Sequence, residues 1–364
     1  MSYPLNKTLL QPRGVERYET IVIGGGQAGL ATGYHLAQRD ADFLILDAND
    51  RVGDSWRNRW DSLRLFTPAK YSGLPGMTFP APAMHLPDKD EVADYMEKYA
   101  ERFDLPIRPS TQVTSLTHDG DRYVVRTENE TYEADSVIVA TGPFQRPRVP
   151  KLAARLPRSV RQLHSSEYHN PLELTPAPVL VVGVGNSGAQ IALEIVRSRN
   201  VYLAGSESGY LRRTLLGLDI YRWIWPFFTW FNLDTRVGKR IRDRSTGADP
   251  LVGIDPRSLS AAGIQRVGKV TEVRDGLPVC DGESIDVATV IWCTGFEADY
   301  SWIDLRIFGE DGYPRHERGA VADAPGLYFV GLRFQYRRTS ALIGGVGADA
   351  AYIAEQVANI HSNS

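Results

Sequence analysis

Two glycine clusters are the part of this chain whose residue types and spacing point most directly to chemistry. The first reads Gly24-Gly25-Gly26-Gln27-Ala28-Gly29, and the second reads Gly183-Val184-Gly185-Asn186-Ser187-Gly188. In a GxGxxG pattern the first glycine permits a tight turn, the second lets the backbone approach a pyrophosphate, and the third lets helix and strand pack closely. The helix that follows such a turn offers free N–H groups and a partial positive charge to phosphates. Two copies in one chain predict two nucleotide sites.

The residues that follow each cluster indicate which nucleotide it binds. Asp47 stands where a second strand would end, and a carboxylate there accepts hydrogen bonds from ribose hydroxyls. Ser206 takes the equivalent place in the second copy. A serine does not repel a 2′-phosphate, and Arg212 and Arg213 follow it, which favours NADPH. Glu207 is adjacent and favours NADH, so both coenzymes stay open.

Regular elements surround both clusters in the same order. Apolar runs predict strands at 20–23 and 43–46 around a helix at 28–39, and strands at 179–182 and 201–204 around a helix at 188–199. Short strands near 112–117, 121–127 and 136–140 indicate a small meander attached to the first unit. The sequence therefore predicts an α/β protein with two Rossmann-like dinucleotide-binding domains.

Two matched strand ends mark the predicted crossings between these domains. Ala140, Thr141 and Gly142 end one apolar run, and Cys293, Thr294 and Gly295 end another. A proline-rich stretch follows the first, which predicts an extended linker. We expect the NAD(P)-binding domain, 146–296, to be inserted in an FAD-binding domain formed by 1–145 and 297–364.

The overall composition excludes several classes of protein. The 364 residues carry a formal net charge of −3 and show no basic stripe, so no nucleic-acid partner is expected. The chain has two cysteines, Cys280 and Cys293, which excludes a CxxC redox pair and a cysteine-rich metal site. We predict no metal ion. The N-terminal residues contain no apolar run of signal-peptide length, so a cytoplasmic location is expected.

Taken together, the motifs GGGQAG, Gly53-Asp-Ser-Trp56, the two ATG-like strand ends and GVGNSG resemble the bacterial class B flavin-containing monooxygenases, relatives of the Baeyer–Villiger enzymes. The resemblance covers nearly the whole chain. It implies FAD in the first domain, NADPH in the second, and oxygen insertion through a flavin C4a-hydroperoxide. The residues that it places at FAD are Gly24, Gly26, Gln27, Ala28, Gly29, Asp47, Trp56, Thr67, Val113, Ala140, Thr141, Gly142 and Leu342. Those that it places at NADP are Gly183, Gly185, Asn186, Ser187, Gly188, Ser206, Arg212 and Thr294.

The chain departs from the family pattern at two places. The stretch between the nucleotide sites keeps His164 and Tyr168 of the family motif but has Arg158 and Val160 in place of its Phe and Gly. Many members carry an asparagine beside the flavin, and here Phe66 stands at about that place. Phe66 is therefore the candidate flavin-facing residue.

The segment 214–234 holds three of the seven tryptophans. Three interpretations are open: a packed lid or substrate funnel over the active site, a contact in a homodimer, and peripheral association with a membrane, which aromatic residues near cations favour.

The function predicted from these features is an FAD- and NADPH-dependent monooxygenase that oxygenates a small amine, sulfide or ketone with dioxygen. Two alternatives remain: an NAD(P)H oxidase or reductase, and a redox-sensing, membrane-associated accessory flavoprotein. No acid–base residue is assigned.

Overall fold

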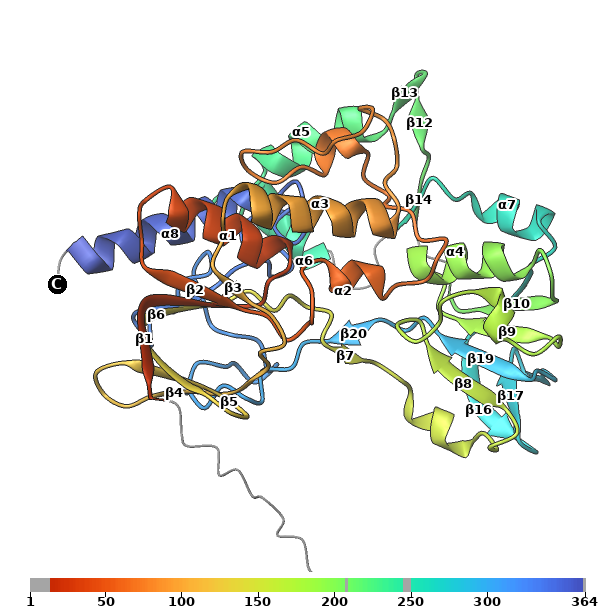
Figure 1. The fold of residues 1–364 in the computed structure, drawn as a ribbon. Coiled ribbons are helices and arrows are strands. Elements are labelled where there is room, and N and C mark those ends of the chain that lie inside the picture. Colours follow the sequence, from red (N-terminus) through yellow and green to blue (C-terminus); the bar gives the residue numbers. More distant parts are fainter. Residues whose placement is uncertain (1–13, 207–208, 245–249, 363–364) are drawn as a thin grey trace, which may run out of the picture.

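The computed structural model describes residues 14–206, 209–244 and 250–362. Its strands form two main sheets in two lobes (Figure 1). The first sheet has the order β3-β2-β1-β6-β5-β4, with β21 added on β6. Its strands are β1 (Glu16–Ile23), β2 (Phe43–Leu46), β3 (Ile107–Arg108), β4 (Val113–His118), β5 (Tyr123–Thr127), β6 (Thr131–Val139) and β21 (Leu327–Phe329).

The five strands β3, β2, β1, β6 and β21 run parallel, whereas β4, β5 and β6 form an antiparallel meander. Helices α1 (Gln27–Ala37), α3 (Lys89–Arg102) and α8 (Gly347–Ser362) lie together on one side of this sheet (Figure 1). Apolar side chains of the segment around Tyr300 and Ile303 pack with strand residues such as Ile21 and Val137 in a second core. The first sheet is thus buried between two layers.

The second sheet has the order β15-β10-β9-β19-β8, and all its strands run parallel. They are β8 (Arg161–His164), β9 (Val179–Val182), β10 (Val201–Ala204), β15 (Gln265–Val267) and β19 (Thr289–Trp292). Helices α4 (Asn186–Ile195) and α7 (Pro256–Ala261) contribute apolar residues to the core. This lobe also contains a small antiparallel sheet of β16 (Val270–Arg274), β17 (Leu277–Cys280) and β18 (Glu283–Ser284), which packs against the second sheet.

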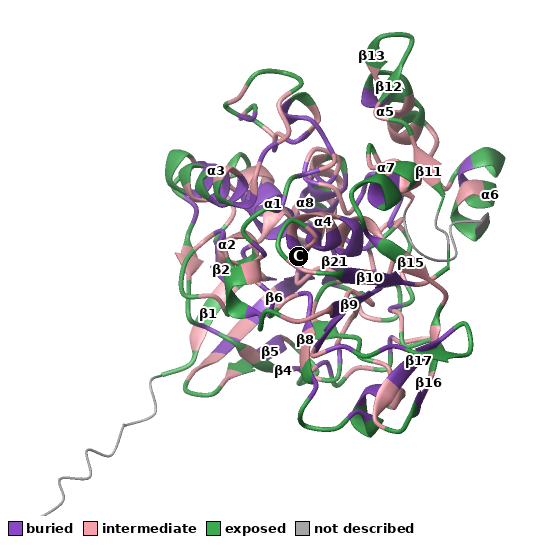
Figure 2. Ribbon diagram, turned by 90° about the vertical axis from the view of Figure 1, so that its right-hand side faces the viewer, coloured by how far each residue is buried: buried purple, intermediate pink, exposed green. Residues whose placement is uncertain are grey.

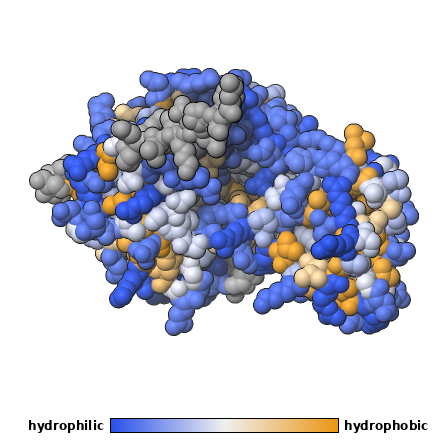
Figure 3. All heavy atoms as spheres, turned by 60° about the horizontal axis from the view of Figure 1, so that its bottom comes forward, coloured by the Kyte–Doolittle hydropathy of each residue, from blue (hydrophilic) through white to orange (hydrophobic). Residues whose placement is uncertain are grey.

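The two lobes are linked by a pair of short antiparallel strands, β7 (Arg146–Pro147) and β20 (Phe296–Glu297). Residues 146 and 296, at which the sequence predicts the domain boundaries, belong to this pair, and the boundaries stay a prediction. Figure 3 shows the lobes as two bulges with a notch between them. Both main sheets are built on parallel strands, and the strands of the second sheet lie between β6 and β21 of the first in sequence, so the predicted α/β fold class is confirmed.

The remaining elements lie outside the two main sheets. They are α2 (Asp54–Arg57), β11 (Tyr210–Leu211), β12 (Thr214–Leu215), β13 (Leu218–Asp219), α5 (Tyr221–Trp230), α6 (Arg236–Arg244) and β14 (Leu251–Val252), with short 3₁₀ turns at Ala69–Tyr71, Lys151–Arg155 and Pro171–Glu173. None of the helices within the described ranges is long and apolar enough to span a bilayer.

Element boundaries differ from the sequence prediction where polar residues mask the pattern. Strand β1 begins at Glu16 rather than residue 20, because its first residues already pair with β6, where Arg17 also forms an ion pair with Glu133. Helix α4 begins at Asn186, two residues earlier than predicted, since the last residues of the glycine turn already form its first turn.

Candidate functional site

The first glycine cluster forms a tight turn between β1 and α1. Gly24 has φ +109°, and a Cβ there would lie 2.8 Å from the carbonyl oxygen of Ala140 at the end of β6. A Cβ on Gly29 would collide with the carbonyl oxygen of Gly24. At Gly26, in contrast, a Cβ would meet nothing within 4 Å. The turn is therefore closely packed at Gly24 and Gly29 and open at Gly26, the second glycine of the GxGxxG motif.

The second cluster repeats this geometry residue by residue. Gly183 has φ +116° and abuts the carbonyl of Cys293 at the end of β19, and a Cβ on Gly188 would collide with Gly183. Gly185 is open in the same way as Gly26. Gly26 and Gly185 are the N-caps of α1 and α4, and neither helix has a side-chain cap. Each helix N-terminus therefore faces an open cradle, which fits a pyrophosphate.

Asp47 lies at the end of β2 and is 7% exposed. Its Oδ2 accepts a hydrogen bond from the Gly25 N–H at 2.7 Å, and its Oδ1 accepts from the backbone N–H and the side-chain amide of Asn49 at 2.8 and 2.7 Å. These bonds brace the glycine turn. They leave little of the carboxylate's capacity for a ribose, so the predicted ribose contact remains a prediction.

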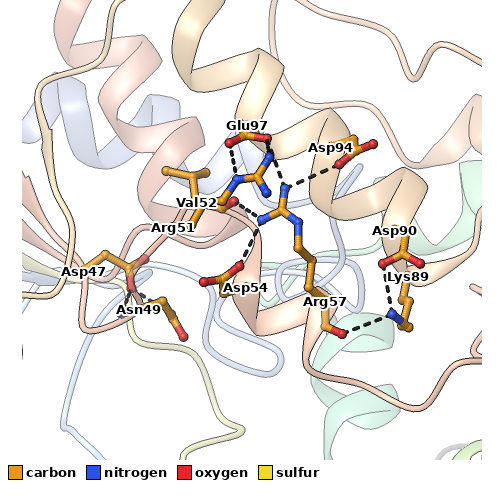
Figure 4. Close-up of polar contacts among 10 residues, drawn as sticks. All are labelled: Asp47, Asn49, Arg51, Val52, Asp54, Arg57, Lys89, Asp90, Asp94 and Glu97. Carbon is orange, nitrogen blue, oxygen red and sulfur yellow. Dashed lines mark hydrogen bonds and ion pairs between the residues drawn. The ribbon is translucent and has the colours of Figure 1, made fainter. Parts of the chain in front are cut away.

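The rest of the first site is held rigidly against α3 (Figure 4). Gly53 has φ +91°, and a Cβ there would lie 2.6 Å from the carbonyl oxygen of Ala93 on α3. Arg57 of α2 forms ion pairs with Asp54 at 3.0 Å and Glu97 at 3.1 Å. This network fixes the short helix that carries the half-buried Trp56.

Phe66 lies on the loop before the Ala69–Tyr71 turn and is half-buried. Its carbonyl accepts a hydrogen bond from Arg213 Nη1 at 2.7 Å, although 147 positions separate the two residues. Nη2 of Arg213 forms a 2.6 Å ion pair with Asp219. Arg213 is thus committed to the protein, which argues against its predicted role at a 2′-phosphate. Arg212 and Ser206 are exposed, and Glu207 lies outside the described residues.

Helix α5 packs over this loop. The ring of Trp225 lies 5.2 Å from that of Tyr71, and Tyr221 is buried beside both. At its other end the segment is tied to the C-terminal loop, because Leu233 N–H donates to the Tyr336 carbonyl at 3.0 Å. The inner face of 214–234 is therefore packed, as the lid interpretation requires.

His164 ends β8 and is 2% exposed. Its Nδ1 is 2.8 Å from Ser166 Oγ, its Nε2 is 3.0 Å from the Gly295 carbonyl, and its ring meets Phe296 edge-on at 4.8 Å. Burial lowers the pKa of His164, so the ring is neutral near pH 7. It is a structural histidine at the β7–β20 link. Tyr168, the other retained residue, donates to Glu194 at 2.9 Å.

The remaining predicted residues divide by location. Gln27 and Ala28 form the first turn of α1, Thr141 and Gly142 follow β6, and Thr294 follows β19. Thr67 is buried, and its hydroxyl is hydrogen-bonded to that of Ser72. Val113 is the first residue of β4, and Leu342 is half-buried in the loop before α8. Asn186 holds the β14 segment, since its amide bonds Pro250 O and Val252 N, both at 3.1 Å.

One buried acidic residue was not identified in the sequence analysis. Asp349, in the first turn of α8, is fully buried, and burial raises its pKa. Its partner, Arg318, lies 4.0 Å away with its guanidinium 4.0 Å from the ring centres of both Tyr336 and Tyr352. A lone acid in the otherwise apolar run GADAAYIA was the available signal.

Comparison with known proteins places these features in a family. Residues 21–228 match the family described as pyridine nucleotide-disulphide oxidoreductase. The chain is 44% identical to an uncharacterized CzcO-like oxidoreductase of Geobacillus kaustophilus, over 94% of this chain and 98% of that one. It is 30% identical to a probable indole-3-pyruvate monooxygenase, YUCCA1, of Arabidopsis thaliana, over 98% and 93%. A flavin-containing monooxygenase structure from Stenotrophomonas maltophilia superimposes with a TM-score of 0.79 at 26% identity, covering 95% of this chain and 100% of that chain.

Proposed function

The chain belongs to the pyridine nucleotide-disulphide oxidoreductase family, and on that premise we propose that it is an FAD- and NADPH-dependent monooxygenase acting on a small amine, sulfide or ketone. The observation that carries the proposal is the duplicated glycine turn. Each copy is packed at its first and third glycines and open at Gly26 or Gly185, in front of an uncapped helix. Two such cradles suit a flavin dinucleotide and a nicotinamide dinucleotide.

The residues present fit these two groups. The backbone of 24–29 and the strand end at 140–142 would hold FAD, with Trp56 and Thr67 nearby. The backbone of 183–188 would hold NADP, with Ser206, Arg212 and Thr294 as further contacts. FAD held in the first cradle would supply a hydride acceptor for NADPH and the site of oxygen chemistry. The chain itself would bind and orient the two groups. The loop at Phe66 and helix α5, which packs over it, would exclude water.

The named relatives support oxygenation of a small molecule. One is a probable indole-3-pyruvate monooxygenase and another a flavin-containing monooxygenase. A carbonyl compound therefore falls within the proposed substrate class. NADPH is preferred over NADH in this proposal because Ser206 carries no charge and an exposed cation, Arg212, follows it six positions later.

A second candidate, an NAD(P)H oxidase, is favoured by one feature. Phe66 offers no side-chain hydrogen bond at the place where many family members carry an asparagine. A thiol–disulfide reductase is disfavoured, since Cys280 and Cys293 form no CxxC pair and burial raises the pKa of the Cys293 thiol to about 12.

Steady-state turnover tests the proposal. The purified protein is mixed with NADPH and a panel of amines, sulfides and ketones, and NADPH consumed, hydrogen peroxide and oxygenated product are measured together. Product that accounts for a substantial part of the NADPH supports a monooxygenase. NADPH oxidation that yields hydrogen peroxide alone across the panel would identify an oxidase. A Gly185→Val variant, which blocks the second cradle, is the control and loses turnover with NADPH.

Three further proposals accompany this function. The FAD-binding domain comprises 1–145 and 297–364, and the NAD(P)-binding domain comprises 146–296. The protein acts in the cytoplasm on a small-molecule substrate with dioxygen. A homodimer and peripheral membrane contact through 214–234 are the partner contacts proposed from the sequence.

A further inference from the structure

Exposed apolar side chains are concentrated in one segment of the chain. Of the twelve large hydrophobic residues that are most exposed in the described part of the chain, seven fall within 215–237. Leu216 at the tip of the β12–β13 hairpin is 83% exposed, and Trp230 at the end of α5 is 82% exposed. The other five are Leu215, Leu218, Trp223, Phe227 and Val237. Isolated exposed apolar residues are ordinary, whereas a cluster of this kind marks an interaction surface.

We call this cluster the hairpin–helix face: the seven residues just named, on the β12–β13 hairpin, α5 and the start of α6. Hairpin and helix are in contact, because the indole N–H of Trp223 reaches the carbonyl of Leu215 at 3.4 Å. In Figures 1 and 2 the hairpin projects from the body beside α5. The β12–β13 hairpin, which carries three of the seven residues, thus projects from the molecule.

The inner side of the same segment is already packed. Tyr221 is buried, Trp225 meets Tyr71, and Arg213 binds the Phe66 carbonyl and Asp219. The outer aromatic residues are therefore not needed to attach the segment to the protein. Their exposure is a property of a folded, anchored element.

The segment is also basic, in contrast to the rest of the chain. Residues 212–243 contain seven arginines and lysines against three carboxylates, a net charge of +4 in a chain of net charge −3. Two of these carboxylates have partners within the protein: Asp219 pairs with Arg213, and the exposed Asp234 accepts a hydrogen bond from Tyr336. Six of the seven cations are exposed, and of these Arg242 forms an ion pair with Asp243; the other five are Arg212, Arg222, Arg236, Lys239 and Arg240.

We propose that the hairpin–helix face docks on an anionic lipid bilayer. Tryptophan, phenylalanine and leucine flanked by cations are the combination that favours the interface between headgroups and acyl chains. Anionic headgroups complement the basic residues, each of which adds to the attraction near a charged surface. A second copy of the chain fits less well, because a two-fold interface would place the same basic face against itself. The docked face is the outer side of the element that covers the Phe66 loop.

Vesicle flotation with the wild-type protein tests the proposal without any assay of turnover. We expect the protein to float with vesicles of equimolar phosphatidylcholine and phosphatidylglycerol, to bind phosphatidylcholine alone much less, and to lose binding as salt is raised. Brominated lipid should quench part of the tryptophan emission. Failure to float with the anionic vesicles at low salt would overturn the proposal, as would flotation that quenches no tryptophan.

Substitutions on the face sharpen the test. The double variant Phe227→Ser with Trp230→Ser should lower partitioning at least tenfold, on the order expected for two aromatic side chains removed from the interface. Arg222→Gln with Arg240→Gln should lower it about 25-fold, since each cation near an anionic surface is worth roughly a factor of five. All changed residues are exposed, and the thermal unfolding midpoint checks that each variant folds.

Matched controls lie elsewhere on the surface. Leu172→Ser changes an apolar residue that is 92% exposed in the turn Pro171–Glu173, and Lys98→Gln changes an exposed cation of α3. Both should partition like the wild type. Equal losses in the control variants would refute the assignment to this face. Sedimentation that shows a dimer dissociated by Trp230→Ser, with no vesicle binding, would assign the face to contact between two copies.

Discussion

Replacing Gly26 by valine separates the binding role of this glycine from any role in folding. Gly26 has φ −78°, an ordinary value for any residue, and a Cβ there meets no atom within 4 Å. The side chain therefore fits the protein as it stands. We expect the free energy of unfolding of the flavin-free variant to differ from that of the flavin-free wild type by no more than about 1 kcal/mol, the scale of a change at a helix N-cap.

Flavin binding should respond quite differently. The space that valine fills is the cradle in front of the α1 N-terminus, where the backbone must approach a pyrophosphate. We expect FAD affinity to fall at least about 100-fold, equivalent to roughly 2.7 kcal/mol. The assay is a titration of flavin-free protein with FAD, followed by fluorescence, together with the flavin content of the protein as purified.

Two matched variants bracket this result. Gly29→Ala places a Cβ against the Gly24 carbonyl, a clash with backbone that no side-chain movement relieves, and should destabilise the fold by more than about 3 kcal/mol. Gly185→Val repeats the Gly26 change in the second turn and should keep FAD while losing reduction by NADPH. A folded Gly26→Val protein with stoichiometric FAD, or a Gly185→Val protein without FAD, would refute the assignment of the two cradles.

Three other predictions concern the coenzyme, the loop and a buried histidine. Arg212→Ala should raise KM for NADPH about 10- to 100-fold and leave KM for NADH unchanged, whereas Arg213→Ala, which releases the Phe66 carbonyl, should affect both coenzymes alike; steady-state kinetics decide this. Phe66→Asn should lower the hydrogen peroxide formed per NADPH consumed by up to about fivefold, the effect of one added hydrogen bond, and an unchanged ratio would place this residue away from the flavin. His164 has a pKa lowered by burial, so the unfolded chain binds the extra proton and stability falls as pH drops below about 6.5. Urea unfolding should show a weaker loss of stability between neutral and mildly acidic pH in His164→Gln than in the wild type, and parallel pH profiles would contradict this assignment.

The sequence determined those features that depend on neighbours within one β-turn-α-β unit. A glycine turn needs a positive φ at Gly24 and close packing at Gly29, and only residues of the adjoining strand and helix enter those requirements. The buried strands Phe43–Leu46, Val179–Val182 and Val201–Ala204 were predicted with their observed bounds for the same reason. Duplication of the unit then predicted the two-domain fold.

Only the tertiary structure decided what the long polar side chains contact. Arg213 was expected near a phosphate because it lies seven positions after Ser206, yet it binds Phe66 and Asp219. Asn186 holds a strand more than 60 positions away, and Asp349 is buried beside Arg318. The two sides of α5 likewise differ because the loop near residue 71 packs on one of them, and the loop near residue 336 holds the chain just after the helix. A long polar side chain can contact several different partners. Which partner it meets depends on segments that are distant in sequence and are brought close only by the tertiary fold.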